Sequence, residues 1–272
     1  MSETSSKPLA KPRQASTVLL VRDSDVGIQA FMLERNKAIK FASGALVFPG
    51  GKVDAADADP ALLAHLQGAA EMTSDARALR VGAIREVFEE SGVLLARKRG
   101  AQLALSKNEA DTIGSRYRAK LLAGEITIQA LVEQEDLELL TQELIYFAHW
   151  ITPNIRPTRF DTHFYLALLP PGQNAEHDGD ESTSSCWIAT RSAAADISAA
   201  GYSAMSPTLM NLEKVSRSET VADAIAQART ATVVTVQPEV HEAADGTRTV
   251  SIPEEAGYNS SNYPFKAGWV KS

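Results

Sequence analysis

The chain has 272 residues, 44% of them hydrophobic, which is enough to fold one large domain around a buried core. Its 34 acidic and 27 basic residues give a net charge near -7, which argues against a broad nucleic-acid surface and favours a small-molecule ligand. The single cysteine, Cys186, excludes an intrachain disulfide, and no apolar run resembles a membrane span or a secretory signal. We therefore expect a cytoplasmic protein that binds neither nucleic acid nor membranes.

The first half of the chain combines short strands with helices. Residues 1–15 are polar and are expected to form a flexible tail. Branched residues on both sides of the turn-prone segment 23–27 predict an antiparallel pair of strands. Capping residues and helically spaced apolar positions predict several helices. The expected strands are 16–22, 28–34 and 45–48, and the expected helices are a short one after Asp59 and Pro60, then 77–91, 106–122 and 127–135.

The second half returns to strands and then adds helices. The expected strands are 144–151, 160–169, 186–189, 233–240 and 248–252, and the expected helices begin at Ser206 and Val221. Strands and helices interleave without a clear boundary, so we expect one α/β domain over residues 16–272. Within it, residues 203–272 are expected to form a C-terminal helical extension.

Three glutamates project from one face of the helix that precedes Gly92. Glu86, Glu89 and Glu90 stand at positions i, i+3 and i+4, which are neighbours on a helix surface. The helix dipole disfavours carboxylates near a helix C-terminus, and Arg85 is the cation close by in the sequence. The pattern indicates a site for Mg²⁺ or Mn²⁺, which prefer oxygen ligands, and a solvated acidic surface is the alternative interpretation.

The sequence around this helix resembles the Nudix hydrolase signature, G-x5-E-x7-R-E-U-x-E-E-x-G-U, in which U is aliphatic. Gly51 matches the first glycine, and residues 85–93 match every defined position of the second half. The resemblance implies the Nudix fold, an αβα sandwich around a mixed central sheet. It also implies hydrolysis of a diphosphate linkage, with metal ions held by Glu86, Glu89 and Glu90.

One segment departs from the signature. Its first glutamate falls on Asp57, and 27 residues rather than seven separate this position from Arg85. We therefore expect an insertion at 58–80 that leaves the metal-binding face intact. The insertion leaves Asp57 with no predicted role beyond shaping the turn.

The interrupted signature is similar to that of one Nudix branch, the peroxisomal coenzyme A diphosphatases. Members of this branch carry LLTxR, a small residue, and then R and G at fixed spacing before FPGG. Here Arg35, Gly44 and residues 48–51 match, whereas Asn36 replaces the small residue, Lys40 replaces the second arginine and FML replaces LLT. The resemblance implies coenzyme A or an acyl derivative as substrate, and ADP-ribose or another nucleoside diphosphate conjugate is the alternative.

Two pairs of residues in this segment are candidates for substrate binding. Arg35 and Lys40 could neutralise a phosphate, and Gly50 with Gly51 would allow the backbone to approach an anion closely. A solvated basic turn and an ordinary tight turn are the alternative interpretations.

Downstream residues extend the candidate site. Segments 150–153 and 159–162 also resemble the coenzyme A branch, and they supply Arg156 and Arg159 as candidate phosphate contacts. Arginines that flank prolines are also commonly just exposed, which is the alternative.

The acidic loop 176–181 precedes the strand that contains Trp187, where Nudix proteins often place a glutamate that binds metal or acts as a base. Glu181 is our choice, with Asp178 and Asp180 as rivals and a solvated acidic loop as the alternative.

The resemblance implies three catalytic residues. Arg85 would orient the carboxylates, and either Glu86 or Glu181 would accept a proton from the attacking water. A Nudix module that binds a nucleotide without cleaving it is the competing class of function, although the three carboxylates argue for an enzyme. A homodimer is compatible with the sequence, and the five histidines show no metal-ligand spacing such as H-x3-H.

Overall fold

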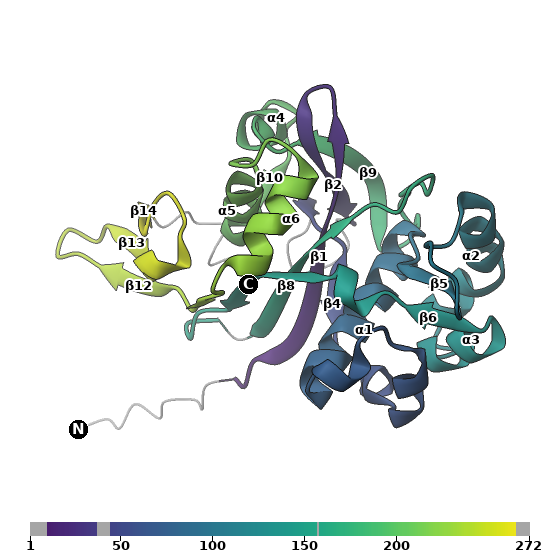
Figure 1. Cartoon of the computed structure of the whole chain (residues 1–272). Coiled ribbons are helices and arrows are strands. Elements are labelled where there is room, and N and C mark those ends of the chain that lie inside the picture. Colours follow the sequence, from purple (N-terminus) through teal and green to yellow (C-terminus); the bar gives the residue numbers. More distant parts are fainter. Residues whose placement is uncertain (1–9, 37–43, 157, 265–272) are drawn as a thin grey trace, which may run out of the picture.

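The computed structural model describes residues 10–36, 44–156 and 158–264, and these residues form a mixed sheet with helices on both faces (Figure 1). The expected α/β sandwich is therefore confirmed. The strands of the main sheet are β1 (Arg13–Ser24), β2 (Gly27–Arg35), β3 (Ala45–Val47), β4 (Gly50–Lys52), β7 (Ile145–Ile151), β8 (Phe160–Leu168), β9 (Ser182–Ala189), β10 (Ser203–Ala204) and β11 (Thr235–Val236).

Strand β1 organises the sheet because it pairs along both edges. Its second half forms the expected antiparallel hairpin with β2 around Gly27, whose φ of 94° suits a tight turn. Its first half pairs antiparallel with β4, and β8 runs parallel to it over nine residue pairs. The path β10-β3-β2-β1-β8-β7-β11 results, with β9 added to β2. This pairing places β4 beside the centre of the sheet.

Apolar side chains fill both faces of the sheet. One core contains α1 (Ser74–Ser91), α2 (Lys107–Leu122) and α3 (Ile128–Gln134), together with a small two-stranded sheet of β5 (Ala96–Lys98) and β6 (Leu137–Leu139). The other core contains α4 (Ala193–Ala199), α5 (Ser206–Val215) and α6 (Val221–Thr230). Figure 1 shows these two groups of helices on opposite sides of the strands.

The segment after Asp59 forms the expected short helix, and further 3-10 turns flank it. The expected helix after Asp59 is a 3-10 helix, Pro60–His65, which Asp59 caps by accepting a hydrogen bond from the Ala61 N–H. It lies between two further 3-10 turns, Ala55–Ala58 and Ala69–Glu71. Two other 3-10 turns lie later in the described chain, at Thr141–Glu143 and at Glu254–Ala256. Leu62 of the 3-10 helix and Leu66 directly after it are buried in the same core as α1 to α3.

The C-terminal extension is not purely helical. The expected strand over 233–240 divides into β11 and β12 (Glu239–Glu242), with Pro238 between them, because proline cannot donate to a strand ladder. Strands β12, β13 (Arg248–Ser251) and β14 (Asn262–Pro264) form a separate antiparallel sheet that projects beyond α5 and α6 in Figure 1. No helix in the described part of the chain is both long and apolar enough to cross a membrane.

Candidate active site

Helix α1 presents the predicted carboxylates because both of its ends are fixed locally. The Thr73 side chain accepts a hydrogen bond from the Ala76 N–H at the first turn. Gly92 ends the helix in the left-handed conformation, with φ 74°, and its N–H donates to the Phe88 carbonyl. Between these ends, Ile84 and Val87 are fully buried in the core. The rotation of α1 about its axis is thereby set.

Arg85 is the centre of the charged network. Its Nη1 donates to Glu86 Oε1 at 3.0 Å and to Glu89 Oε2 at 2.9 Å, and its Nη2 donates to the Lys52 carbonyl at 2.8 Å. The side chain is only 9% exposed, so these charge-assisted bonds form largely out of water. Arg85 thus hydrogen-bonds two of the three predicted metal ligands.

Asp57 has a larger role than shaping a turn. Its two carboxylate oxygens accept hydrogen bonds from Nε and Nη2 of Arg85, both at 2.9 Å, and its side chain is fully buried. A Cβ on Gly82 would lie 2.9 Å from Asp57 Oδ2, so the glycine makes room for this contact. The expectation for Asp57 was therefore too narrow, because the segment that follows it folds away and leaves it against α1. It positions Arg85.

The Gly50–Gly51 turn meets the same face of α1. The Gly50 N–H donates to Glu90 Oε2 at 2.8 Å, and a Cβ on Gly51 would lie 2.5 Å from Glu86 Oε1. Only glycine leaves room for the Glu86 carboxylate at this distance. Gly50 has φ 155°, and a Cβ there would lie 2.4 Å from the Ser16 carbonyl oxygen. The structure therefore brings together the two halves of the signature, although 33 residues lie between Gly51 and Arg85.

Burial shifts the proton affinities of these carboxylates. It raises the pKa of Glu86 to about 7 and the pKa of Glu90 well above its ordinary value, and it also raises the pKa of Glu89. The charge of Arg85 lowers the pKa values of Glu86 and Glu89 but does not cancel the effect of burial. Arg85 itself keeps its charge, since its neighbours raise its pKa despite burial.

The carboxylates fit a divalent cation by chemistry. All three offer oxygen ligands, Glu89 and Glu90 are buried while the Glu86 side chain is 14% exposed, and their charges repel one another, which are conditions that a hard cation relieves. Glu89 is held by Arg85, whereas Glu90 is held by Gly50. Within the described residues their ligand atoms do not all lie within 4.8 Å of one another, so a cation shared by all three would require them to draw together.

Two further predicted residues act electrostatically on Glu90. The charge of Arg35 lowers the pKa of Glu90 and the charge of Glu181 raises it. Arg35 ends β2 and pairs with Ser182 of β9, directly after Glu181. The Arg35 Nε is buried and has no hydrogen-bond partner within the described residues, so it is a donor without an acceptor.

The acidic loop is organised by Asp178 rather than by Glu181. The Asp178 carboxylate accepts hydrogen bonds from the backbone N–H groups of Asp180, Glu181 and Ser182. This leaves Asp178 in a turn-stabilising role, while Glu181 is exposed. Lys40 lies outside the described residues.

The two downstream arginines differ in their surroundings. Arg159 is buried and donates to the carbonyls of Thr152 and Ala10 and to the Gln237 side chain, so it ties β8 to neighbouring segments. This geometry adds no support to a phosphate contact by Arg159. Arg156 is half-buried, which lowers its pKa, and it follows the turn after β7.

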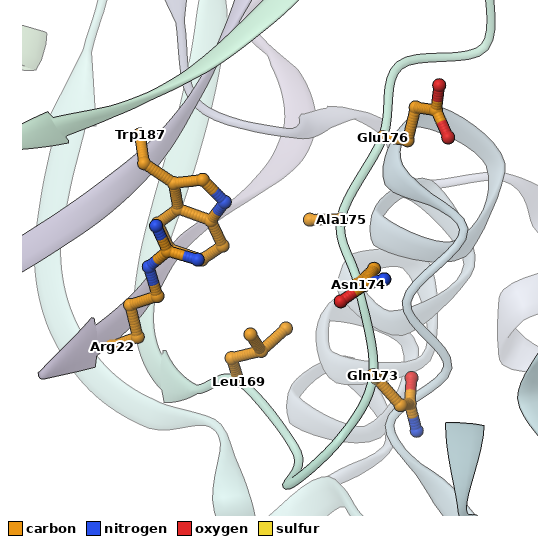
Figure 2. Close-up of a pocket in the computed structure, with 7 residues that line it drawn as sticks. All are labelled: Arg22, Leu169, Gln173, Asn174, Ala175, Glu176 and Trp187. Carbon is orange, nitrogen blue, oxygen red and sulfur yellow. The ribbon is translucent and has the colours of Figure 1, made fainter.

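A pocket of about 290 Å³ lies beside the C-terminal end of α1 (Figure 2). It is adjacent to that end because the Glu176 N–H donates to the Ser91 carbonyl and Gln173 bonds to the backbone of Leu94. Figure 2 shows Arg22 against Trp187, at 4.0 Å from the ring centre, across from the backbone of residues 173–176. No sequence motif indicates this pocket, because its walls come from β1, β9 and the segment after β8.

Comparisons with known proteins agree with this geometry. The family model described as "NUDT19 Nudix domain" matches residues 64–214. The Caenorhabditis elegans protein "Putative nudix hydrolase 7" is 27% identical over 210 residues, which are 75% of this chain and 61% of that protein. This chain therefore spans about three fifths of the length of that relative.

Solved structures show the same similarity. The crystal structure of a NUDIX hydrolase from Alicyclobacillus acidocaldarius has a TM-score of 0.63 and 26% identity, with 80% of this chain and 97% of that chain covered. The NUDIX domain of Shewanella oneidensis NrtR, complexed with ADP ribose, has a TM-score of 0.41 and 12% identity over 78% of this chain and 96% of that chain, which is too distant to carry an argument about ligands. The match to residues 64–214 covers more than half of the chain, so the chain belongs to the Nudix hydrolase family, within the group of the NUDT19 Nudix domain.

Proposed function

We propose that this protein hydrolyses the diphosphate linkage of a nucleotide-derived substrate in a reaction that depends on Mg²⁺ or Mn²⁺. One observation carries the proposal. The half-buried carboxylate of Glu86 and the buried carboxylate of Glu90 lie against the Gly50–Gly51 turn, next to an arginine that a buried aspartate holds in place. Nudix enzymes generally use divalent metals, and three carboxylates at one end of a helix supply oxygen ligands for such ions.

Each residue of the network has a distinct task in this mechanism. Glu86, Glu89 and Glu90 would hold the metal, which supplies charge neutralisation at the diphosphate and a lowered pKa of the attacking water. Arg85 keeps Glu86 and Glu89 oriented through its two bonds. Glu86 or Glu181 accepts the proton of the water as its oxygen attacks phosphorus. The pKa of Glu86, about 7, suits a group that exchanges a proton near neutral pH.

The substrate side of the proposal rests on Arg35 and the pocket at Trp187. The buried Nε of Arg35 has no hydrogen-bond partner among the described residues, and a phosphate oxygen could accept from it. Lys40 would assist it, and Arg156 and Arg159 are the remaining predicted phosphate contacts. The Arg22–Trp187 pair offers a cation and an aromatic surface for the part of the substrate that does not react.

Coenzyme A or an acyl derivative is our choice of substrate because of the spacing of Arg35, Gly44 and residues 48–51. Attack of water on the diphosphate would give 3′,5′-ADP and a phosphopantetheine product. ADP-ribose and other nucleoside diphosphate conjugates share the same reacting group, and they are the second candidates.

The test is a panel of diphosphate compounds incubated with Mg²⁺ or Mn²⁺, with products identified by mass. We expect turnover of coenzyme A compounds, its loss in chelator, and a fall of at least about 100-fold in E89Q and E90Q. The variant E125Q, which alters an exposed carboxylate after α2, is the matched control and should retain activity. Turnover of ADP-ribose alone would reject the coenzyme A choice and keep the reaction class. Nucleotide binding without any turnover would instead support the non-catalytic module.

A further inference from the structure

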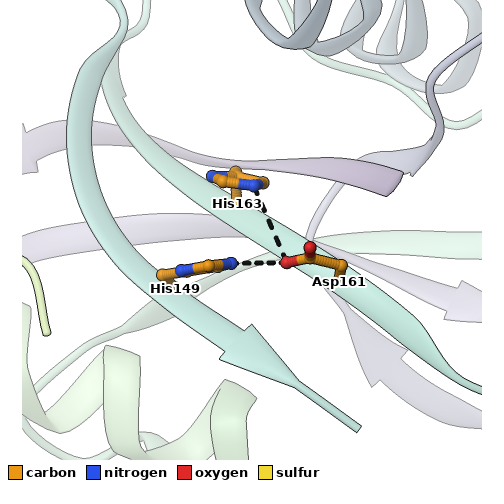
Figure 3. Close-up of side chains that lie close together, drawn as sticks. All are labelled: His149, Asp161 and His163. Atoms are coloured by element: carbon orange, nitrogen blue, oxygen red, sulfur yellow. Dashed lines mark hydrogen bonds and ion pairs between the residues drawn. The ribbon is translucent and has the colours of Figure 1, made fainter. Parts of the chain in front are cut away.

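Three side chains with metal-ligating atoms, none of them a predicted site residue, meet on the sheet (Figure 3). His149 lies on β7, and Asp161 and His163 lie on the adjacent strand β8. Their ligand atoms all lie within 4.8 Å of one another, the only such group of three within the described residues. His149 pairs directly with His163, and Asp161 is two residues before His163, so all three side chains share one face of the sheet.

Both imidazole rings are oriented toward the same carboxylate oxygen. His149 Nε2 hydrogen-bonds Asp161 Oδ1, and His163 Nε2 lies 3.7 Å from that atom. The other ring nitrogens are occupied, since His149 Nδ1 lies 2.7 Å from the Thr235 hydroxyl and His163 Nδ1 lies 2.9 Å from the Tyr146 hydroxyl. A hydrogen bond to Nδ1 of a histidine fixes the orientation of its ring. This leaves Nε2 facing the position that a metal ion would occupy.

The carboxylate is also held in place, and the group remains open to water. Asp161 Oδ2 accepts a hydrogen bond from the Gln14 amide at 3.0 Å, so β1, β7, β8 and β11 all contribute to the cluster. The side chains of His149 and His163 are each 15% exposed and that of Asp161 is 21% exposed. A bound ion could therefore complete its coordination with water.

We propose that His149, Asp161 and His163 form a second metal site, for a borderline transition-metal ion such as Zn²⁺. Two imidazole nitrogens and one carboxylate oxygen match the three protein ligands and open position of many zinc sites, whereas Mg²⁺ prefers oxygen ligands alone. The ion takes the place of the proton shared by His149 and Asp161, and that proton is released to solvent. The site joins β7 and β8 to β11, the strand that leads out of the helical part of the C-terminal extension.

The test measures binding of Zn²⁺ alone to the chelator-treated full chain, by calorimetry and elemental analysis. We expect one tight site that weakens at least about 100-fold in H149Q and H163Q and persists in E90Q, which changes only the glutamate site. Cobalt(II) should give a visible absorption band in the wild type that H163Q abolishes. Equal binding by the wild type and H163Q, loss of binding in E90Q, or no tight binding at all would each overturn the proposal.

Two milder variants keep the test decisive if the histidine variants do not fold. Y146F and T235V retain all three ligands and remove only the hydroxyl groups that orient the rings. We expect each to weaken Zn²⁺ binding by about 10-fold to 100-fold. Unchanged affinity in both variants would overturn the proposal, because the measured ion would then be bound elsewhere and the cluster would be only a hydrogen-bonded network.

Discussion

The substitution E86Q should stabilise the metal-free protein at neutral and alkaline pH. Burial raises the pKa of Glu86 to about 7 from its ordinary value of 4.5, so the folded protein resists ionisation of this group. Glutamine has the shape of the protonated carboxyl group and cannot ionise. The variant therefore removes a charge that the fold accommodates poorly without a cation.

The direction and size of the effect follow from linkage. Because the folded pKa is raised, the stability cost is absent below about pH 4.5, grows as the pH rises, and is complete above about pH 7. A difference between 4.5 and about 7 corresponds to about 3 kcal/mol, at about 1.4 kcal/mol per pH unit. We expect E86Q and the wild type to match near pH 4.5 and E86Q to be more stable by up to about 3 kcal/mol at pH 8.

Urea unfolding in excess chelator, followed from pH 4.5 to pH 8, measures this difference. E125Q removes one exposed carboxylate and controls for the change of net charge. Addition of Mg²⁺ or Mn²⁺ should stabilise the wild type more than E86Q at pH 8, because the ion replaces the proton. Equal or lower stability of E86Q at pH 8 would refute the reasoning, since it would mean that Arg85 fully compensates the buried charge.

Two substitutions test parts of the site and a third tests helix α2, which lies outside it. D57N should destabilise the protein by about 3 kcal/mol in thermal or urea unfolding, because it breaks a buried ion pair in which Asp57 accepts two hydrogen bonds from Arg85. The control D111N alters an exposed ion pair with Lys107 and should cost no more than about 0.5 kcal/mol. G51A should lower the turnover of any diphosphate substrate at least about 10-fold while leaving the protein folded, since its Cβ would displace the Glu86 carboxylate. Full activity of G51A would contradict the importance of the close approach of Gly51 to Glu86. G114A should stabilise α2 by about 0.5–1 kcal/mol without loss of activity, because its Cβ would meet only Phe88 at 3.9 Å, and a destabilised variant would show that the helix does not tolerate a side chain there.

The parts of the site that the sequence predicted are those fixed by local interactions. Helix α1 ends at Gly92 as expected, because a left-handed terminating residue acts within one turn. Ser106 and Glu109 form the expected capping box at the start of α2 for the same reason. The spacing of Glu86, Glu89 and Glu90 likewise predicted a shared helix face. None of these features needs knowledge of how distant segments pair.

The features that the sequence did not predict depend on long-range pairing. Asp57 reaches Arg85 only because the segment between them folds into 3-10 turns that leave the aspartate against α1. His149 and His163 meet only through the register of β7 and β8, which includes an irregularity between Tyr146 and Ala148. A search for histidines at helical spacing could not find this pair, whereas a search across the predicted strands 144–151 and 160–169 could have.

The balance of charge around α1 explains why the site should be incomplete without a cation. Asp57, Glu86 and Glu89 hydrogen-bond Arg85 and the exposed Asp54 carboxylate lies 3.7 Å from it, so one guanidinium faces four carboxylates, and Glu90 is held separately by Gly50. Asp57 takes two of the arginine bonds, which leaves only one for each of Glu86 and Glu89. The remaining negative charge must be neutralised by protons, which the raised pKa values of Glu86 and Glu90 favour, or by metal ions. Protons and metal ions therefore compete for the same oxygens, and metal affinity should rise with pH through about 7 as Glu86 loses its proton.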